Sequence, residues 1–155
     1  AELKTDVINV HASGGIEMMR RAAEEVRKIS PDTKIIAVTQ LTSTSAEMLR
    51  DELLIETPMT ETVRHYAENA KKAGLDGIVC SPLEAGKVHE SCGNDFLTVT
   101  PGVRFADGDI GDQKRVMTPA QAQEIGSDYI VVGRPITAAE DPVAAYNRCV
   151  AEFCD

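Results

Sequence analysis

The chain has 155 residues, 43% of them hydrophobic and 26% charged, and its formal net charge is −9. This composition excludes a disordered chain, and the absence of any run of about 18 apolar residues argues against a membrane span. The 16 basic residues against 25 acidic ones argue against a nucleic-acid partner, although a local arginine cluster could still bind an anionic small molecule.

Short apolar runs alternate with amphipathic segments along the chain. Strands are predicted at Val7–His11, Lys34–Thr39, Gly77–Ser81, Phe96–Thr100 and Tyr129–Gly133. These runs are rich in β-branched residues and do not alternate with polar ones, which is typical of parallel strands covered on both faces. Helices are predicted at Gly15–Ile29, Glu61–Ala73, Leu83–Ser91, Pro119–Ile125 and Pro142–Phe153.

Helix boundaries have their own sequence signals. Ser81 and Thr118 each precede a proline and stand three residues before an acid or an amide, which is the pattern of a capping box. Thr44 stands three residues before a glutamate and fits the same pattern without the proline. Gly74 and Gly126 lie where helix-ending glycines are expected.

The alternation of strands and helices predicts a parallel α/β sheet with right-handed crossovers. No linker interrupts the chain, so residues 1–155 are expected to form a single domain. Two architectures satisfy this pattern. One is a complete doubly wound sheet, and the other is part of a (β/α)8 barrel, which normally needs about 250 residues.

The cysteines show neither a CxxC pair nor a zinc-like spacing with the histidines. We interpret them as free thiols of a reducing cytosol, with Cys154 exposed and the other three packed inside. The first residues contain no apolar segment of the signal-peptide kind. We therefore expect a cytoplasmic protein without a metal site.

In either architecture, ligands gather at the carboxyl ends of the strands. The last predicted strand ends in Gly133 and Arg134. A glycine lets a phosphate approach the backbone, an arginine offers a bidentate fork, and a short helix could begin just afterwards. The alternative is a strand-end glycine followed by a solvated arginine.

The loop before that strand, Thr100–Gln113, is long and contains several glycines, Arg104 and an amide donor. It could close over an anion, or it could be a surface loop without a role. Its aspartates do not form a calcium loop, because the glycine and the acids fall at the wrong offsets.

Several segments together resemble orotidine 5'-phosphate decarboxylases in order and approximate spacing. They are Thr39–Ser43, Cys80–Ala85, Thr100–Arg104, Asp112–Val116 and Val132–Thr137, and Val10–Gly15 resembles the family's fourth strand. The resemblance runs from about Asp6 to Tyr146. It implies a (β/α)8 TIM-type barrel, of which this chain supplies about strands 4 to 8 with their helices.

The resemblance also implies a set of substrate-binding residues, namely Thr42, Ser81, Pro101, Arg104, Gln113, Gly133 and Arg134. By this resemblance Gln113, Gly133 and Arg134 hold the 5'-phosphate, and Arg104 lies in the closing loop. Ser81 hydrogen-bonds the pyrimidine. Thr42 and Pro101 complete the pocket.

Each of these assignments has a plainer alternative. Ser81 is also a good helix cap, Thr42 could only start a turn, and Pro101 could only end a strand. Nothing in the sequence places an acid–base partner beside His11, His65 or Glu84, so these residues are expected to be structural.

The chain departs from the family in one respect. The Asp-x-Lys-x-x-Asp motif of the family's third strand is absent, as are the acid and the lysine of its first two strands. In the family this lysine protonates C6 of the substrate as carbon dioxide leaves. The segment Glu2–Asp6 has the wrong spacing to replace it. We therefore expect no catalytic residue in this chain, and doubtful activity for the chain alone.

The resemblance implies a parent lyase that converts orotidine 5'-phosphate to uridine 5'-phosphate and carbon dioxide in pyrimidine biosynthesis. It implies no cofactor, no nucleic-acid or membrane partner, and a homodimer. One alternative is a non-catalytic partial barrel that binds a phosphate ligand. Another is a related sugar-phosphate lyase or aldolase, against which Ser81 and Pro101 argue. A receiver-like domain would require acids after the first strand, where His11, Ala12 and Ser13 stand.

Overall fold

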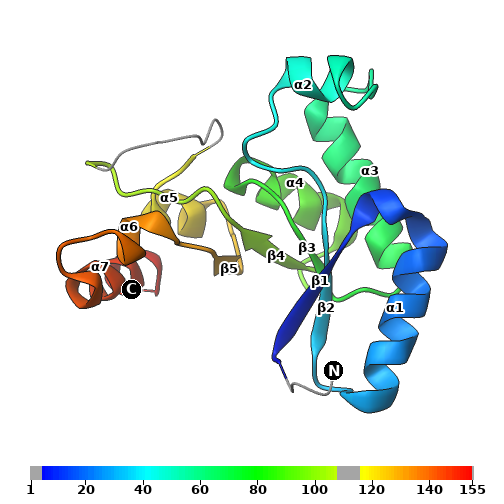
Figure 1. Ribbon diagram of the computed structural model, residues 1–155, viewed down its shortest axis with the longest axis horizontal. Coiled ribbons are helices and arrows are strands. Elements are labelled where there is room, and N and C mark those ends of the chain that lie inside the picture. Colours follow the sequence, from blue (N-terminus) through cyan, green and yellow to red (C-terminus); the bar gives the residue numbers. More distant parts are fainter. Residues whose placement is uncertain (1–4, 108–115, 155) are drawn as a thin grey trace.

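The computed structural model describes residues 5–107 and 116–154 (Figure 1). The strands are β1 (Val7–His11), β2 (Lys34–Val38), β3 (Gly77–Val79), β4 (Leu97–Thr100) and β5 (Tyr129–Ile130). The helices are α1 (Gly15–Ile29), α2 (Ala46–Asp51), α3 (Met59–Lys72), α4 (Pro82–Cys92), α5 (Pro119–Glu124), α6 (Arg134–Thr137) and α7 (Pro142–Cys154), and a 3-10 turn, η1 (Ala12–Gly14), precedes α1.

The strand order decides between the two architectures. The sheet runs β1-β2-β3-β4-β5, and each neighbouring pair is parallel. A doubly wound sheet reverses its strand order at a switch point, whereas a (β/α)8 barrel adds each strand beside the previous one. The order contains no reversal, so the fold is a partial TIM-type barrel, as the resemblance implied.

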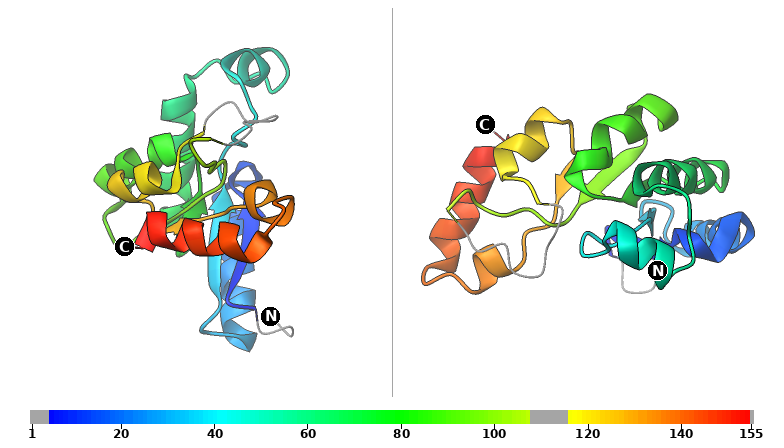
Figure 2. Two further views of the ribbon diagram at one scale, coloured as in Figure 1. Left: turned by 90° about the vertical axis from the view of Figure 1, so that its left-hand side faces the viewer. Right: turned by 90° about the horizontal axis from the view of Figure 1, so that it is seen from above.

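The hydrophobic core lies between the sheet and the helices along one of its sides. Helices α1, α3 and α4 lie side by side there (Figures 1 and 2). Ile35 and Ile78 of the sheet are fully buried against Met19 of α1, Val63 of α3 and Val88 of α4. Burial of such side chains contributes about 1.5–3 kcal/mol each.

The prediction that both faces of the strands are covered is confirmed for β2, where Ile35, Ile36 and Ala37 are all buried, but not for the edge strands β1 and β5. Val7, Asn9 and His11 of β1 are exposed, while the alternate residues are half-buried. On the face of the sheet that is turned away from α1, α3 and α4, side chains line an apolar hollow of about 230 Å³. Its lining includes Val7, Leu97, Val99 and Tyr129. In a barrel this face is the interior, which side chains from every strand fill together, so Val7 and Tyr129 at its two edges are apolar but exposed here.

Most local signals are confirmed. Ser81 and Thr118 begin α4 and α5 with complete capping boxes, and Gly74 and Gly126 follow helix ends with positive φ. The cysteines are free, with only Cys154 exposed, as predicted.

Most predicted elements differ at one or both ends by one to three residues, and two of these differences have a clear structural cause. The cap of α2 is Ser45 rather than Thr44, because Thr44 closes a turn onto the Leu41 carbonyl and the Ser45 hydroxyl accepts from the Met48 N–H. Strand β5 stops at Ile130, before the predicted end at Gly133. That glycine instead caps α6.

Candidate active site

Most of the predicted ligand residues follow strands that are neighbours in the sheet. Thr42 comes after β2, Ser81 after β3, Arg104 after β4 and Arg134 after β5. Because the strands are parallel and consecutive, their carboxyl ends open at one edge of the sheet. The fold therefore brings these segments to the same edge. Gln113 lies outside the described residues.

Ser81 is fully buried and caps helix α4. Its hydroxyl oxygen accepts from the Leu83 N–H at 3.3 Å, and the Glu84 carboxylate accepts from the Ser81 N–H at 2.9 Å. The expectation that Glu84 is structural is thereby supported. A capping hydroxyl acts as an acceptor, which leaves its proton to donate to a ligand. Capping and pyrimidine binding are thus chemically compatible, and the second remains a prediction.

Arg104 lies at the base of the loop after β4 and is only 8% exposed. Its guanidinium donates to the Val103 carbonyl at 2.7 Å, and its backbone N–H donates to the Met117 carbonyl at 2.9 Å. Val103 and Met117 also form a β-bridge. Residues on the two sides of the predicted closing loop are therefore joined. Pro101, half-buried, follows directly after the end of β4.

The short helix predicted after Gly133 is present as α6. The backbone N–H groups of Ile136 and Thr137 donate to the Gly133 carbonyl at 2.9 and 3.0 Å. Gly133 and Arg134 are both exposed, and a Cβ added at Gly133 would meet nothing within 4 Å. The space in front of this glycine is open, as a phosphate approaching the backbone would require.

A cavity of about 550 Å³ lies beside the carboxyl ends of β1 and β2. Its lining includes His11, Gln40, Leu41 and Tyr66, and the neighbouring Thr42 is 6% exposed. His11, which the sequence predicts to be structural, lines this cavity. Its place as the last residue of a strand is the signal that could have marked it.

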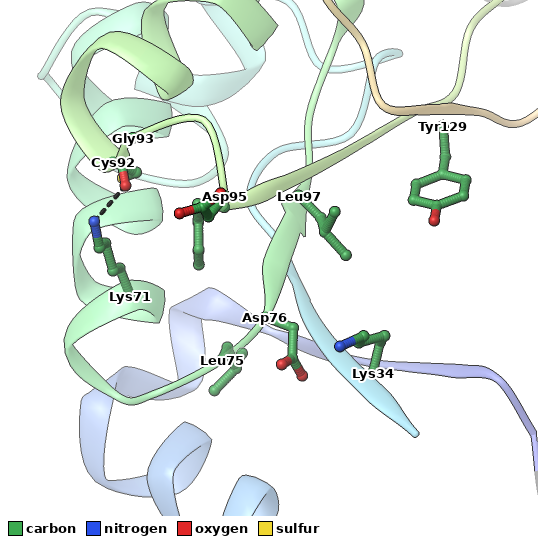
Figure 3. A pocket seen from close by; sticks show the side chains of 10 residues that line it. Lys34, Lys71, Leu75, Asp76, Cys92, Gly93, Asp95, Leu97 and Tyr129 are labelled. Atoms are coloured by element: carbon green, nitrogen blue, oxygen red, sulfur yellow. Dashed lines mark hydrogen bonds between the residues drawn. The ribbon is translucent and has the colours of Figure 1, made fainter. Parts of the chain in front are cut away.

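A second cavity, of about 490 Å³, lies at the opposite edge, among the amino ends of β2 to β5 (Figure 3). Lys71 donates to the Cys92 carbonyl there, and Asp76 accepts from the Ile35 N–H at 2.8 Å. These polar groups bond to the backbone, and they join α3 to α4 and the turn before β3 to β2. In barrels, residues at the amino-terminal edge of the strands stabilise the fold, whereas ligands bind at the carboxyl edge. We therefore assign no ligand to this cavity.

Residues 5–107 and 116–154 contain no group of three or more histidine, cysteine or acidic side chains that could hold a metal ion. Across the same ranges no helix is long and apolar enough to cross a membrane.

A family model described as "Orotidine 5'-phosphate decarboxylase / HUMPS family" matches residues 1–149. The chain belongs to this family. Orotidine 5'-phosphate decarboxylases of Staphylococcus saprophyticus and Streptococcus thermophilus are each 55% identical to it, over 148 and 155 residues. The matches cover 96% and 100% of this chain but only 64% and 66% of those relatives.

Solved structures show the same relationship. The crystal structure of orotidine 5'-phosphate decarboxylase from Lactobacillus acidophilus is 44% identical, with a TM-score of 0.86, and covers 99% of this chain. An uncharacterized conserved protein from Geobacillus kaustophilus is also 44% identical, with a TM-score of 0.79. This chain covers 66% and 64% of those two chains. It therefore spans about two thirds of the family members that it matches.

Proposed function

We propose that the chain is a single partial-barrel domain that carries the substrate-binding residues of an orotidine 5'-phosphate decarboxylase. The observation that carries this proposal is the 55% identity to proteins of that name along 96% or more of the chain. The fold supports it, because the candidate ligand residues follow neighbouring parallel strands at one edge. The parent enzyme would convert orotidine 5'-phosphate to uridine 5'-phosphate and carbon dioxide.

Each binding role rests on the chemistry of its residue. Gly133 offers backbone to the 5'-phosphate, while Arg134 and Gln113 offer side-chain donors. Ser81 offers a hydroxyl proton to the pyrimidine. Arg104 contributes positive charge from the base of the β4 loop.

Thr42 and Pro101 complete the proposed pocket between these polar groups. Thr42 lies next to the cavity at the carboxyl ends of β1 and β2. Pro101 directly follows β4, three residues before Arg104, whereas Ser81 follows the neighbouring strand β3. The ring of Pro101 offers an apolar surface to the ligand. The pocket would then grip the nucleotide at its phosphate and at its base.

The reaction requires a proton donor, and the lysine that donates the proton in the family is absent from these 155 residues. Breaking the carbon–carbon bond leaves an electron pair on C6, which must be protonated as carbon dioxide departs. The family's lysine motif has no counterpart in the sequence. We therefore propose binding by this chain and catalysis only by a complete barrel. We further propose a cytoplasmic homodimer that needs no cofactor.

A related sugar-phosphate lyase or aldolase is the second candidate, because the exposed Gly133 and Arg134 could hold the phosphate of either kind of substrate. Both would bind the phosphate at Gly133 and Arg134. Only a decarboxylase requires contacts to a pyrimidine. A non-catalytic phosphate-binding domain would also bind the phosphate at these two residues. It would not turn over the substrate, even when the barrel is complete.

Calorimetric titration with uridine 5'-phosphate, uridine and ribose 5-phosphate separates these candidates. We expect uridine 5'-phosphate to bind more tightly than either of the other two, because it engages both ends of the site. Equal affinity for uridine 5'-phosphate and ribose 5-phosphate would remove the pyrimidine contacts and favour a sugar-phosphate enzyme. No binding of any of the three would contradict the proposed binding role.

A further inference from the structure

Arg148, on helix α7, joins that helix to the segment that follows β4. Its Nη1 donates to both carboxylate oxygens of Asp107, at 2.9 and 3.1 Å, across 41 residues of sequence. Its guanidinium carbon lies 4.2 Å from the centroid of the Phe105 ring. Its Nε donates to Glu152 at 2.7 Å, one helical turn further on. We call Phe105, Asp107 and Arg148 the α7 clamp.

The clamp acts on the segment that begins with Arg104. Val103, just before it, is fully buried and bridged to Met117. This bridge fixes the base of the segment, and the clamp attaches it a second time at Phe105 and Asp107. The segment is thereby held along the surface of α7.

Helix α7 also packs against α6, which begins at Arg134 (Figures 1 and 2). Cys149, next to the clamp arginine, is buried on the side of α7 that faces Ile136 of α6 and Ile130 of β5. One helix therefore supports the two segments that carry Arg104 and Arg134. The position of α7 therefore determines how the two arginine segments lie relative to each other.

We propose that Arg148 is a positioning residue for phosphate binding: it holds Phe105 and Asp107 on α7 and so fixes the Arg104 segment relative to α6, which packs on the same helix. This inference rests on the proposed function, because it assumes that Arg104 and Arg134 serve one anionic ligand. Arg148 itself touches neither arginine in the contacts described above, and it acts through the clamp.

The contacts of the clamp are individually weak. Asp107 is 72% exposed and Arg148 is 43% exposed, so solvent screens their attraction. An exposed cation–π contact is also modest. Attached and detached arrangements of the segment should therefore both be populated, and ligand affinity should follow the attached fraction. If removing Arg148 lowers the attached fraction to about one fifth of its value in the unsubstituted chain, the apparent Kd rises about fivefold.

The test compares Arg148→Met with Arg21→Met as a matched control. Arg21 forms an exposed pair with Glu17 on α1, one turn away, and within the described residues no hydrogen bond or ion pair joins it to the β4 segment. Both variants are titrated with uridine 5'-phosphate and with uridine. We expect R148M to weaken uridine 5'-phosphate about fivefold and to leave uridine unchanged. R21M should change neither.

A second arm approaches the clamp from the loop side. The double variant Phe105→Leu with Asp107→Asn removes the same contacts while keeping Arg148. It should reproduce the loss in R148M, and combining all three substitutions should add nothing further. Hydrogen exchange in peptides covering residues 103–107 should accelerate in each of these variants, without added ligand.

The outcomes distinguish the clamp from the function on which it rests. Unchanged exchange at 103–107 and unchanged nucleotide affinity in R148M would overturn the clamp. Equal losses for uridine and uridine 5'-phosphate would show a general structural role and would also overturn it. Failure of the unsubstituted chain to bind either ligand would overturn the proposed function instead, and the exchange comparison would still decide whether Arg148 holds the segment.

Discussion

The Asp128 carboxylate accepts a hydrogen bond from the Thr98 backbone N–H at 2.7 Å, which ties the residue before β5 to β4. The Thr98 hydroxyl donates to the same oxygen at 2.9 Å, and His89 of α4 lies 3.4 Å from it. The carboxylate thus satisfies a backbone donor at the amino end of the sheet, next to a helix that covers it.

Asp76 repeats this arrangement at β2 and β3, where it accepts from the Ile35 N–H at 2.8 Å. Each aspartate stands two residues after a helix-ending glycine, Gly74 or Gly126, and just before a strand. The segments Gly-x-Asp are therefore one structural device used twice. Neither the device nor the part that His89 plays in it was predicted from the sequence.

Asp128→Ala should destabilise the fold because it leaves the Thr98 N–H without its acceptor. An unsatisfied backbone donor in a partly buried position costs about 1–3 kcal/mol. Urea denaturation followed by circular dichroism measures this change in the free energy of unfolding. Asp51→Ala is the control, since Asp51 is exposed and its ion pair is with the adjacent Arg50 on the same helix. Equal stabilities of the two variants would contradict the assigned role of Asp128.

The hydrogen bonds from Arg148 lower the pKa of Asp107 below its ordinary value. A carboxyl group with a depressed pKa in the folded state stabilises that state above its unfolded pKa of about 3.9, and the contribution disappears as the pH falls through the lower folded value. We expect the clamp to be intact at neutral pH and lost only in acid. Carboxyl carbon chemical shifts, titrated in the wild type and in R148M, should show the Asp107 pKa rising in the variant.

Arg134→Ala should weaken uridine 5'-phosphate without weakening uridine. A charge-assisted hydrogen bond contributes about 1.5–3 kcal/mol, and the exposure of Arg134 favours the lower end, near a tenfold loss of affinity. Calorimetric titration of both ligands measures the difference, with Arg20→Ala on the remote helix α1 as the control. An equal loss for both ligands would remove Arg134 from the phosphate site.

The cysteines should react with a thiol reagent in two separate phases. Cys154 is exposed and should react fast, whereas Cys80, Cys92 and Cys149 are buried and should react only on unfolding. Burial also raises the pKa of the Cys149 thiol, which keeps it in the less nucleophilic protonated form at neutral pH. Cys154→Ser should abolish the fast phase. A fast phase that survives this substitution would show that another thiol is accessible.

The 155-residue chain alone should not decarboxylate orotidine 5'-phosphate, because its sequence lacks the family's lysine motif and no lysine among residues 5–107 and 116–154 directly follows the carboxyl end of a strand. Adding a separate polypeptide with the first three strands of a family member should cover the apolar face that carries Val7 and Tyr129, and could restore turnover. The fall in substrate absorbance measures the activity. Turnover by the lone chain would show that a different group delivers the proton.

The sequence by itself determined the features that depend on contacts between near neighbours. Strand Val7–His11 and helix Gly15–Ile29 were predicted to the residue, because β-branched runs and helical periodicity act locally. The Ser81 and Thr118 caps also join residues three positions apart. The family followed from motifs in a fixed order, and the comparisons confirm it. The substrate-binding roles inferred from the same motifs stay predictions.

The tertiary structure decided what depends on residues that are distant in sequence. The strand order separated a barrel from a doubly wound sheet, since both have the same local periodicity. Neither the β-branched runs nor the helical periodicity of the sequence predicts the contact of Arg148 with Asp107. Such contacts form only when the packing of helices against the sheet brings two separate segments together.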